Sequence, residues 1–162
     1  MRNLAIDPRL IELAIWFHDA VYDPERDDNE DKSAEYAEKT LLEIGLPGGQ
    51  ARKVSKMIKA TKHREEARDK DTQLLLDIDL SILGQPAEQY RDYTKKIRRE
   101  YSHLSTKEYA RKRIRFLQGM LERRDIYHTS YFKKKYEQTA RRNLRQEIET
   151  LKRSLDLYSD PA

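Results

Sequence analysis

The sequence contains no cysteine, and it has only five glycines and five prolines in 162 residues. The lack of cysteine excludes disulfide bonds and thiolate metal sites, so any metal ion must be held by histidine and carboxylate side chains. The scarcity of glycine and proline argues against a sheet protein rich in turns. No apolar run reaches membrane-spanning length and no secretory signal opens the chain, so we expect no membrane contact and a cytoplasmic location.

Charge is what this chain has in abundance. Charged residues make up 38% of the sequence and hydrophobic residues 37%, with a net charge of +4 and a pI of about 9.1. This small excess suits an anionic substrate but does not by itself indicate nucleic-acid binding. The basic clusters of the C-terminal half are interleaved with acidic residues, which favours solvated helix faces over a nucleic-acid surface.

Apolar residues recur at helical spacing along most of the chain. Asp7-Pro8 is typical of a helix start, Gly45 of a helix end, and Ser105-x-x-Glu108 of a capping box. The apolar run 74–80 fits a buried strand or a buried helix, and we favour a helix because no other segment offers a strand partner. The pattern predicts one all-α domain of six or seven helices, the last of them long.

His18 and Asp19 follow five apolar residues at the end of the first predicted helix. Buried imidazole and carboxylate groups need hydrogen bonds or a cation, and together they suit a divalent transition metal. Adjacent helical residues point about 100° apart, so the pair can contact one ion only near a helix end, where it lies. The alternative is an aspartate that caps the helix beside a core histidine.

Two further acids, Asp77 and Asp79, lie within the apolar sequence Leu-Leu-Leu-Asp-Ile-Asp-Leu. Buried acids are uncommon unless a cation or several donors accompany them. Asp77 is the better candidate ligand because core residues flank it on both sides, and Asp79 is suited to orienting a ligand or water. The alternative for this pair is a helix N-cap with an ion pair to lysine or arginine.

Lys62 and His63 end the third predicted helix, where an ammonium and an imidazole side by side suit a phosphate or a second metal. An exposed histidine favoured by the helix dipole is the alternative. Glu30 is a candidate base or substrate contact, although Asn29, Glu30 and Ser33 also fit as caps of the second helix.

The order of these residues along the chain matches the pattern of a known protein family. The chain resembles the metal-dependent phosphohydrolases of the HD superfamily, in particular a small bacterial family of all-helical proteins, from about Leu10 to Leu151. The stretches that carry the resemblance are 13–22, Asn29-Glu30 with Ser33-Ala34, 60–63, and 76–80 with 82–84, followed by 126–129, Glu137, Ala140-Arg141 and Asn143-Leu144.

The resemblance implies an HD-like helical bundle that holds a divalent ion such as Mn, Ni, Co, Fe, Zn or Mg. By this resemblance His18, Asp19 and Asp77 are metal ligands, and His63 lies near the phosphate or a second metal. A metal-activated water then attacks phosphorus in a nucleotide or another small phosphate ester, while Lys62 and His63 offset the developing charge.

The chain departs from the family at one point: the family's first histidine ligand lies on a helix before the region of Leu10, and no histidine precedes His18 here. The resemblance therefore leads us to expect a domain without that helix, a weaker metal site and a possible homodimer. The alternative is a non-catalytic HD-like helical module that binds a nucleotide, a protein or a nucleic acid.

Overall fold

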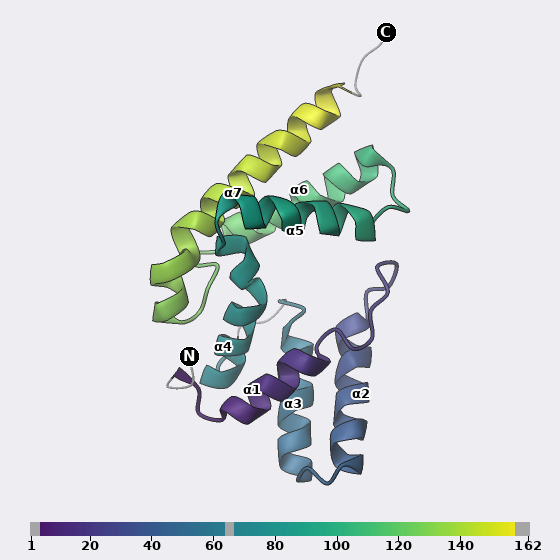
Figure 1. Ribbon diagram of the computed structural model, residues 1–162, viewed down its shortest axis with the longest axis vertical. Coiled ribbons are helices and arrows are strands. Elements are labelled where there is room, and N and C mark those ends of the chain that lie inside the picture. Colours follow the sequence, from purple (N-terminus) through teal and green to yellow (C-terminus); the bar gives the residue numbers. More distant parts are fainter. Residues whose placement is uncertain (1–3, 64–66, 158–162) are drawn as a thin grey trace. The chain divides into compact units, whose positions relative to one another are not determined.

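The computed structural model describes residues 4–63 and 67–157, and in these residues all regular structure is helical (Figure 1). The helices are α1 (Pro8–Phe17), α2 (Asn29–Glu43), α3 (Gly48–Ala60), α4 (Lys70–Asp79), the 3-10 helix η2 (Leu80–Gly84), α5 (Ala87–Glu100), α6 (Thr106–Glu122) and α7 (Ser130–Leu157). The predicted all-α class, the number of helices and the long last helix are confirmed. No helix in the described part of the chain is long and apolar enough to cross a membrane.

The chain divides into two compact units, Met1–Asp79 and Leu80–Ala162, which we describe separately. α1 to α4 belong to the first unit, and η2 to α7 belong to the second. The expectation of a single domain stays a prediction.

In the first unit, α1 begins where the sequence indicates. The Asp7 carboxylate accepts hydrogen bonds from the backbone amides of Arg9 and Leu10 at 3.2 and 3.4 Å, and Pro8 takes the first helical position. Leu10 and Ala14 are almost completely buried, so they form the apolar face with which α1 packs on its neighbours. This packing fixes the direction in which α1 ends, at His18.

Asp71, in the first turn of α4, ties the start of the first unit to α3. Its side chain has no exposed surface; it accepts hydrogen bonds from the Ile6 amide at 2.7 Å and the Lys53 ammonium at 2.6 Å, and a longer one from the Asp7 amide. Burial acts to raise the pKa of Asp71, but these donors outweigh it and hold the pKa below its usual value. A buried charge therefore joins the segment before α1 to α3 and α4.

In the second unit, η2 packs closely on α7. A Cβ atom added to Gly84 would lie 2.5 Å from the Tyr136 Cβ atom, so only glycine allows this approach. The Tyr127 hydroxyl donates to the Leu80 carbonyl at 3.0 Å, and the Asn143 amide donates to the Leu83 carbonyl at 2.8 Å. Side chains thus satisfy carbonyl groups that the short η2 helix leaves open.

α5, α6 and α7 share one buried polar cluster. Arg113 of α6 contacts the Glu147 carboxylate of α7 through two guanidinium nitrogens, at 2.8 and 3.2 Å, and Tyr90 of α5 donates its hydroxyl to the same carboxylate. Burial and the carboxylate together raise the pKa of Tyr90, while Glu147 raises that of Arg113 despite its burial. The cluster therefore joins the three helices through satisfied charges.

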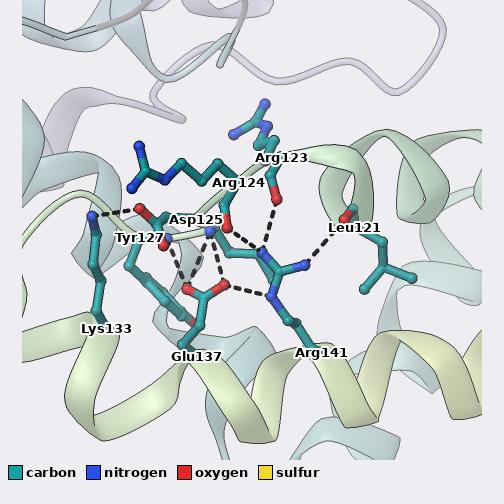
Figure 2. Close-up of polar contacts among 9 residues, drawn as sticks. Leu121, Arg123, Arg124, Asp125, Tyr127, Lys133, Glu137 and Arg141 are labelled. Carbon is teal, nitrogen blue, oxygen red and sulfur yellow. Dashed lines mark hydrogen bonds and ion pairs between the residues drawn. The ribbon is translucent and has the colours of Figure 1, made fainter.

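The turn between α6 and α7 is held by two side chains of α7, Glu137 and Arg141, which also form an ion pair at 2.7 Å (Figure 2). The Glu137 carboxylate accepts from the backbone amides of Ile126 and Tyr127. Arg141 donates to three carbonyl oxygens at the end of α6 and in the turn, those of Leu121, Arg123 and Arg124. These residues, part of the resemblance noted above, have structural roles in this chain.

Candidate functional site

His18 ends α1, and its ring is held in one orientation by the backbone. The Nδ1 atom lies 2.8 Å from the Ile15 carbonyl oxygen, which can only accept, so Nδ1 carries the proton in this contact. The other ring nitrogen, Nε2, lies 3.2 Å from Asp19 Oδ2 and 3.6 Å from Asp79 Oδ1. The backbone contact therefore directs Nε2 toward two carboxylates.

Asp79, the last residue of α4, lies between two imidazoles. Its Oδ2 atom is 2.9 Å from His63 Nε2, and its Oδ1 atom faces His18. The four residues His18, Asp19, His63 and Asp79, which we call the imidazole–carboxylate cluster, come from the ends of α1 and α4 and from the segment after α3. All four belong to the first unit.

His63 has a backbone conformation that side chains seldom adopt. Its φ is +53°, in the left-handed region, and its amide donates to the Ala60 carbonyl at 2.9 Å. Histidine tolerates this region better than most residues, but the conformation is uncommon and such outliers concentrate at functional sites. Here the left-handed residue follows the turn after α3 and brings the ring to Asp79.

The cluster is partly buried, which strengthens the interactions between its charges. The exposed fraction of the side chain is 11% for His63 and 26% for Asp79, against 63% for Asp19. The Asp79 carboxylate raises the pKa of His18 to about 9 although burial opposes this. Burial acts to raise the pKa of Asp79, but the two histidines outweigh it and lower the value to about 2. Without a bound ion, the cluster is therefore a charged network.

The loop after Asp19 is anchored by two side chains at the start of α2. Asn29 Oδ1 accepts from the Asp23 amide at 3.0 Å, and its Nδ2 donates to the Asp23 carbonyl at 2.7 Å. Ser33, which is fully buried, accepts from the Val21 amide and donates to the Val21 carbonyl. Asn29 and Ser33 thus hold the loop that carries Asp19, while α2 begins after Asp28 without a side-chain cap.

Lys62 is engaged by an acid that sequence reasoning did not single out. Its ammonium lies 2.5 Å from Asp31 Oδ2, and this contact lowers the pKa of Asp31 below its usual value. Glu30 precedes Asp31 in the first turn of α2, and within the described residues no hydrogen bond or ion pair joins it to Lys62 or to the cluster. The substrate-contact roles of Lys62 and Glu30 stay predictions.

Asp77 is completely buried in α4, as its apolar neighbours indicate. Residues two apart on a helix point about 200° apart, so Asp77 and Asp79 face different surroundings. The contacts described above place Asp79, whose suggested part was to orient a ligand or water, against both histidines. The ligand role of Asp77 stays a prediction.

The cluster suits a divalent ion in donor type and in pairwise spacing. Metal bonds of about 2.0–2.2 Å, at tetrahedral or octahedral angles, separate two donor atoms by about 2.8–3.6 Å. The imidazole–carboxylate pairs of the cluster are 2.9–3.6 Å apart. In the described residues, no group of three or more histidine or acidic side chains is arranged to hold one ion as it stands, so binding requires at least one side chain to rotate.

Comparison with known proteins adds no further constraint, because no family model, curated protein or solved structure matches this chain. The resemblance to the HD superfamily therefore stays a prediction from the sequence.

Proposed function

We propose that this chain is a metal-dependent phosphohydrolase whose reaction centre is the imidazole–carboxylate cluster. The observation that carries the proposal is the position of the Asp79 carboxylate, which faces Nε2 of both His18 and His63. Three separate chain segments converge there, and one of them does so through a left-handed histidine.

The residues of the cluster divide the work as follows. His18, oriented by the Ile15 carbonyl, and Asp19 and Asp79 supply the donor atoms for a divalent ion. When bound, such an ion supplies Lewis acidity and a lowered pKa for water at the site. Lys62 and His63, in the segment after α3, supply an ammonium group and an imidazole to contact the oxygens of a small phosphate ester, and Asp31 holds the Lys62 side chain in place.

A non-catalytic helical binding module is the second candidate. It is favoured by the way in which the four side chains of the cluster pair with one another, imidazole to carboxylate. In this case the cluster stabilises the ends of α1 and α4 and needs no ion.

The proposal is tested by counting metal ions and measuring phosphate release in the same preparations. Purified protein loaded with Mn²⁺, Co²⁺ or Ni²⁺ is analysed by mass spectrometry for metal per chain, and is then assayed on a panel of phosphate esters. For the wild type we expect at least one ion per chain and phosphate release that depends on the metal. In Asp79→Asn we expect metal binding and the rate of phosphate release each to fall by about 100-fold. The melting temperature in Mn²⁺ provides a readout independent of activity.

Two further variants make the result specific. Asp92→Asn removes an exposed acid that pairs with Lys95 on α5, so we expect it to leave metal content and activity unchanged. Asp77→Asn tells the two acids of α4 apart: if it removes the ion while Asp79→Asn does not, Asp77 is the ligand. Equal metal content and equal activity in the wild type and both α4 variants would show that neither acid holds the ion. A wild type that binds no metal and releases no phosphate would exclude the phosphohydrolase and leave the binding module.

A further inference from the structure

The second unit contains a groove that the proposed hydrolase does not use. It lies between α5 and α7, has a volume of about 650 Å³ and is open to solvent. Its lining runs over residues 87–95 of α5 and 143–153 of α7, which at 1.5 Å per residue is a length of about 12–15 Å. Asn143 donates to the Gln85 carbonyl at 2.9 Å and fixes one end of the groove.

The rim of this groove is cationic. Arg91 and Lys95 line it from α5, and Arg145 and Arg153 line it from α7. Within the described part of the chain, the guanidinium groups of Arg91 and Arg145 make no ion pair or hydrogen bond, and both residues are exposed. Two acids also line the groove: Glu147 is already neutralised by Arg113, and Glu149 is exposed, so the lining keeps an excess of positive charge.

The floor of the groove offers no comparable charge. Ala87, Tyr90 and Thr94 lie on one face of α5 at spacings of three and four residues, and all three line the groove. Tyr90 is 4% exposed, and its hydroxyl is engaged by Glu147. An occupant therefore meets a largely apolar floor between two cationic edges.

The net charge of the second unit also favours an anionic partner. Residues 80–162 contain twenty lysines and arginines against eleven acids, a net charge of +9, whereas residues 1–79 contain thirteen against eighteen, a net charge of −5. An anionic partner is therefore attracted to the second unit before it makes any contact.

We propose that the α5–α7 groove is a docking site for an acidic amphipathic helix of a partner protein. Carboxylates of that helix pair with Arg91 and Arg145, and its apolar face covers the floor at Ala87, Tyr90 and Thr94. The 12–15 Å length accommodates about two to three helical turns. The proposal goes beyond the hydrolase function, since all its residues belong to the second unit.

A peptide fits this groove better than a nucleic acid does. A phosphate backbone is charged along its whole length, so it would bring negative charge over the apolar floor. The aromatic ring at the floor is 4% exposed, which leaves little surface for stacking a base. An amphipathic helix instead places its charges at the edges and its apolar residues at the centre.

The test uses fluorescence anisotropy with a labelled helical peptide of about fourteen residues that carries glutamates along one face and leucines along the other. Two comparison probes are the same peptide with glutamine for glutamate, and a single-stranded oligonucleotide of equal net charge. We expect the acidic peptide to bind the full chain more tightly than either. Arg91→Ser combined with Arg145→Ser should weaken its binding by at least about fivefold, because two ion pairs are lost.

The control combines Arg111→Ser with Lys112→Ser, which removes two exposed charges of α6 outside the groove, and we expect less than a twofold change. Thr94→Trp fills the groove without changing its charge, and we expect it to block the peptide. Circular dichroism checks that each variant folds. Equal losses in the two double variants, tighter binding of the oligonucleotide, or no peptide binding up to about millimolar concentration would each overturn the proposal.

Discussion

Asp71 and Asp79, near the two ends of α4, are both carboxylates whose neighbours hold the pKa below its usual value, but the neighbours differ in kind. Backbone amides and one ammonium surround Asp71, and these groups only donate hydrogen bonds. Two imidazoles surround Asp79, and a neutral imidazole can also bind a metal ion. The contacts of Asp71 therefore indicate a role in stability, whereas Asp79 is the acid on which the proposed function depends.

Replacing Asp71 with asparagine tests the structural half of this assignment. The variant keeps the shape of the side chain but leaves the Lys53 ammonium and the two backbone amides without a charged acceptor. We expect the free energy of unfolding at pH 7 to fall by about 2 kcal/mol, measured by urea denaturation. Metal content should match the wild type, and a loss of metal would show that Asp71 acts on the cluster.

The pH dependence of this difference has a definite sign. The pKa of Asp71 is lowered by folding from 3.8, so its charge stabilises the folded state fully above pH 3.8. That contribution is lost as the pH falls through the folded pKa, whereas asparagine does not titrate. The stability gap between wild type and Asp71→Asn should therefore be constant from pH 7 to 5 and narrow below pH 3.8. A gap that widens in acid would contradict the assignment.

At the scale of helices, local signals in the sequence determine several of the boundaries. The capping box of Ser105 and Glu108 starts α6 as predicted, and Gly45 ends α2 with a φ of +88°. The absence of any strand partner correctly identified the run 74–80 as helical. No local signal predicts the change from α4 to η2 after Asp79, and the side chains that bind the η2 carbonyl groups, Tyr127 and Asn143, lie far away in sequence.

The residue types of the candidate site were predictable from the sequence, but which acid of α4 contacts the two histidines was not. The sequence pointed to His18, Asp19 and His63, and all three lie in one cluster. Choosing between Asp77 and Asp79 requires the direction from which His63 approaches α4. That direction depends on the left-handed backbone at His63, which no local pattern in the sequence reveals.

Two glycines provide a matched test of the packing between η2 and α7. Gly84→Ala would place a Cβ atom 2.5 Å from that of Tyr136, so we expect a loss of about 1–3 kcal/mol in the free energy of unfolding. At Gly119, within α6, a new Cβ atom meets nothing within 4 Å. Gly119→Ala should therefore stabilise the protein by about 0.5–1 kcal/mol. Thermal denaturation of both variants measures this opposite response, and equal shifts would refute the close approach.

At the scale of the molecule, opposite charges are segregated between the two units, with −5 in residues 1–79 and +9 in residues 80–162. The proposed metal site lies in the acidic unit, and the groove proposed for an acidic helix lies in the basic unit. The small net charge of the whole chain conceals this segregation. Charge counted per unit is therefore more informative here than the total.

This segregation predicts how salt acts on each unit. Repulsion between like charges grows with the square of the net charge, so it is roughly three times larger in the second unit than in the first. Raising the salt concentration from about 20 to 200 mM screens this repulsion. We expect amide hydrogen exchange in α5–α7 to slow at least about twofold more than in α1–α4, measured by mass spectrometry. Faster exchange in α5–α7 would mean instead that exposed pairs such as Lys95–Asp92 and Lys133–Asp125, which salt weakens, outweigh the repulsion.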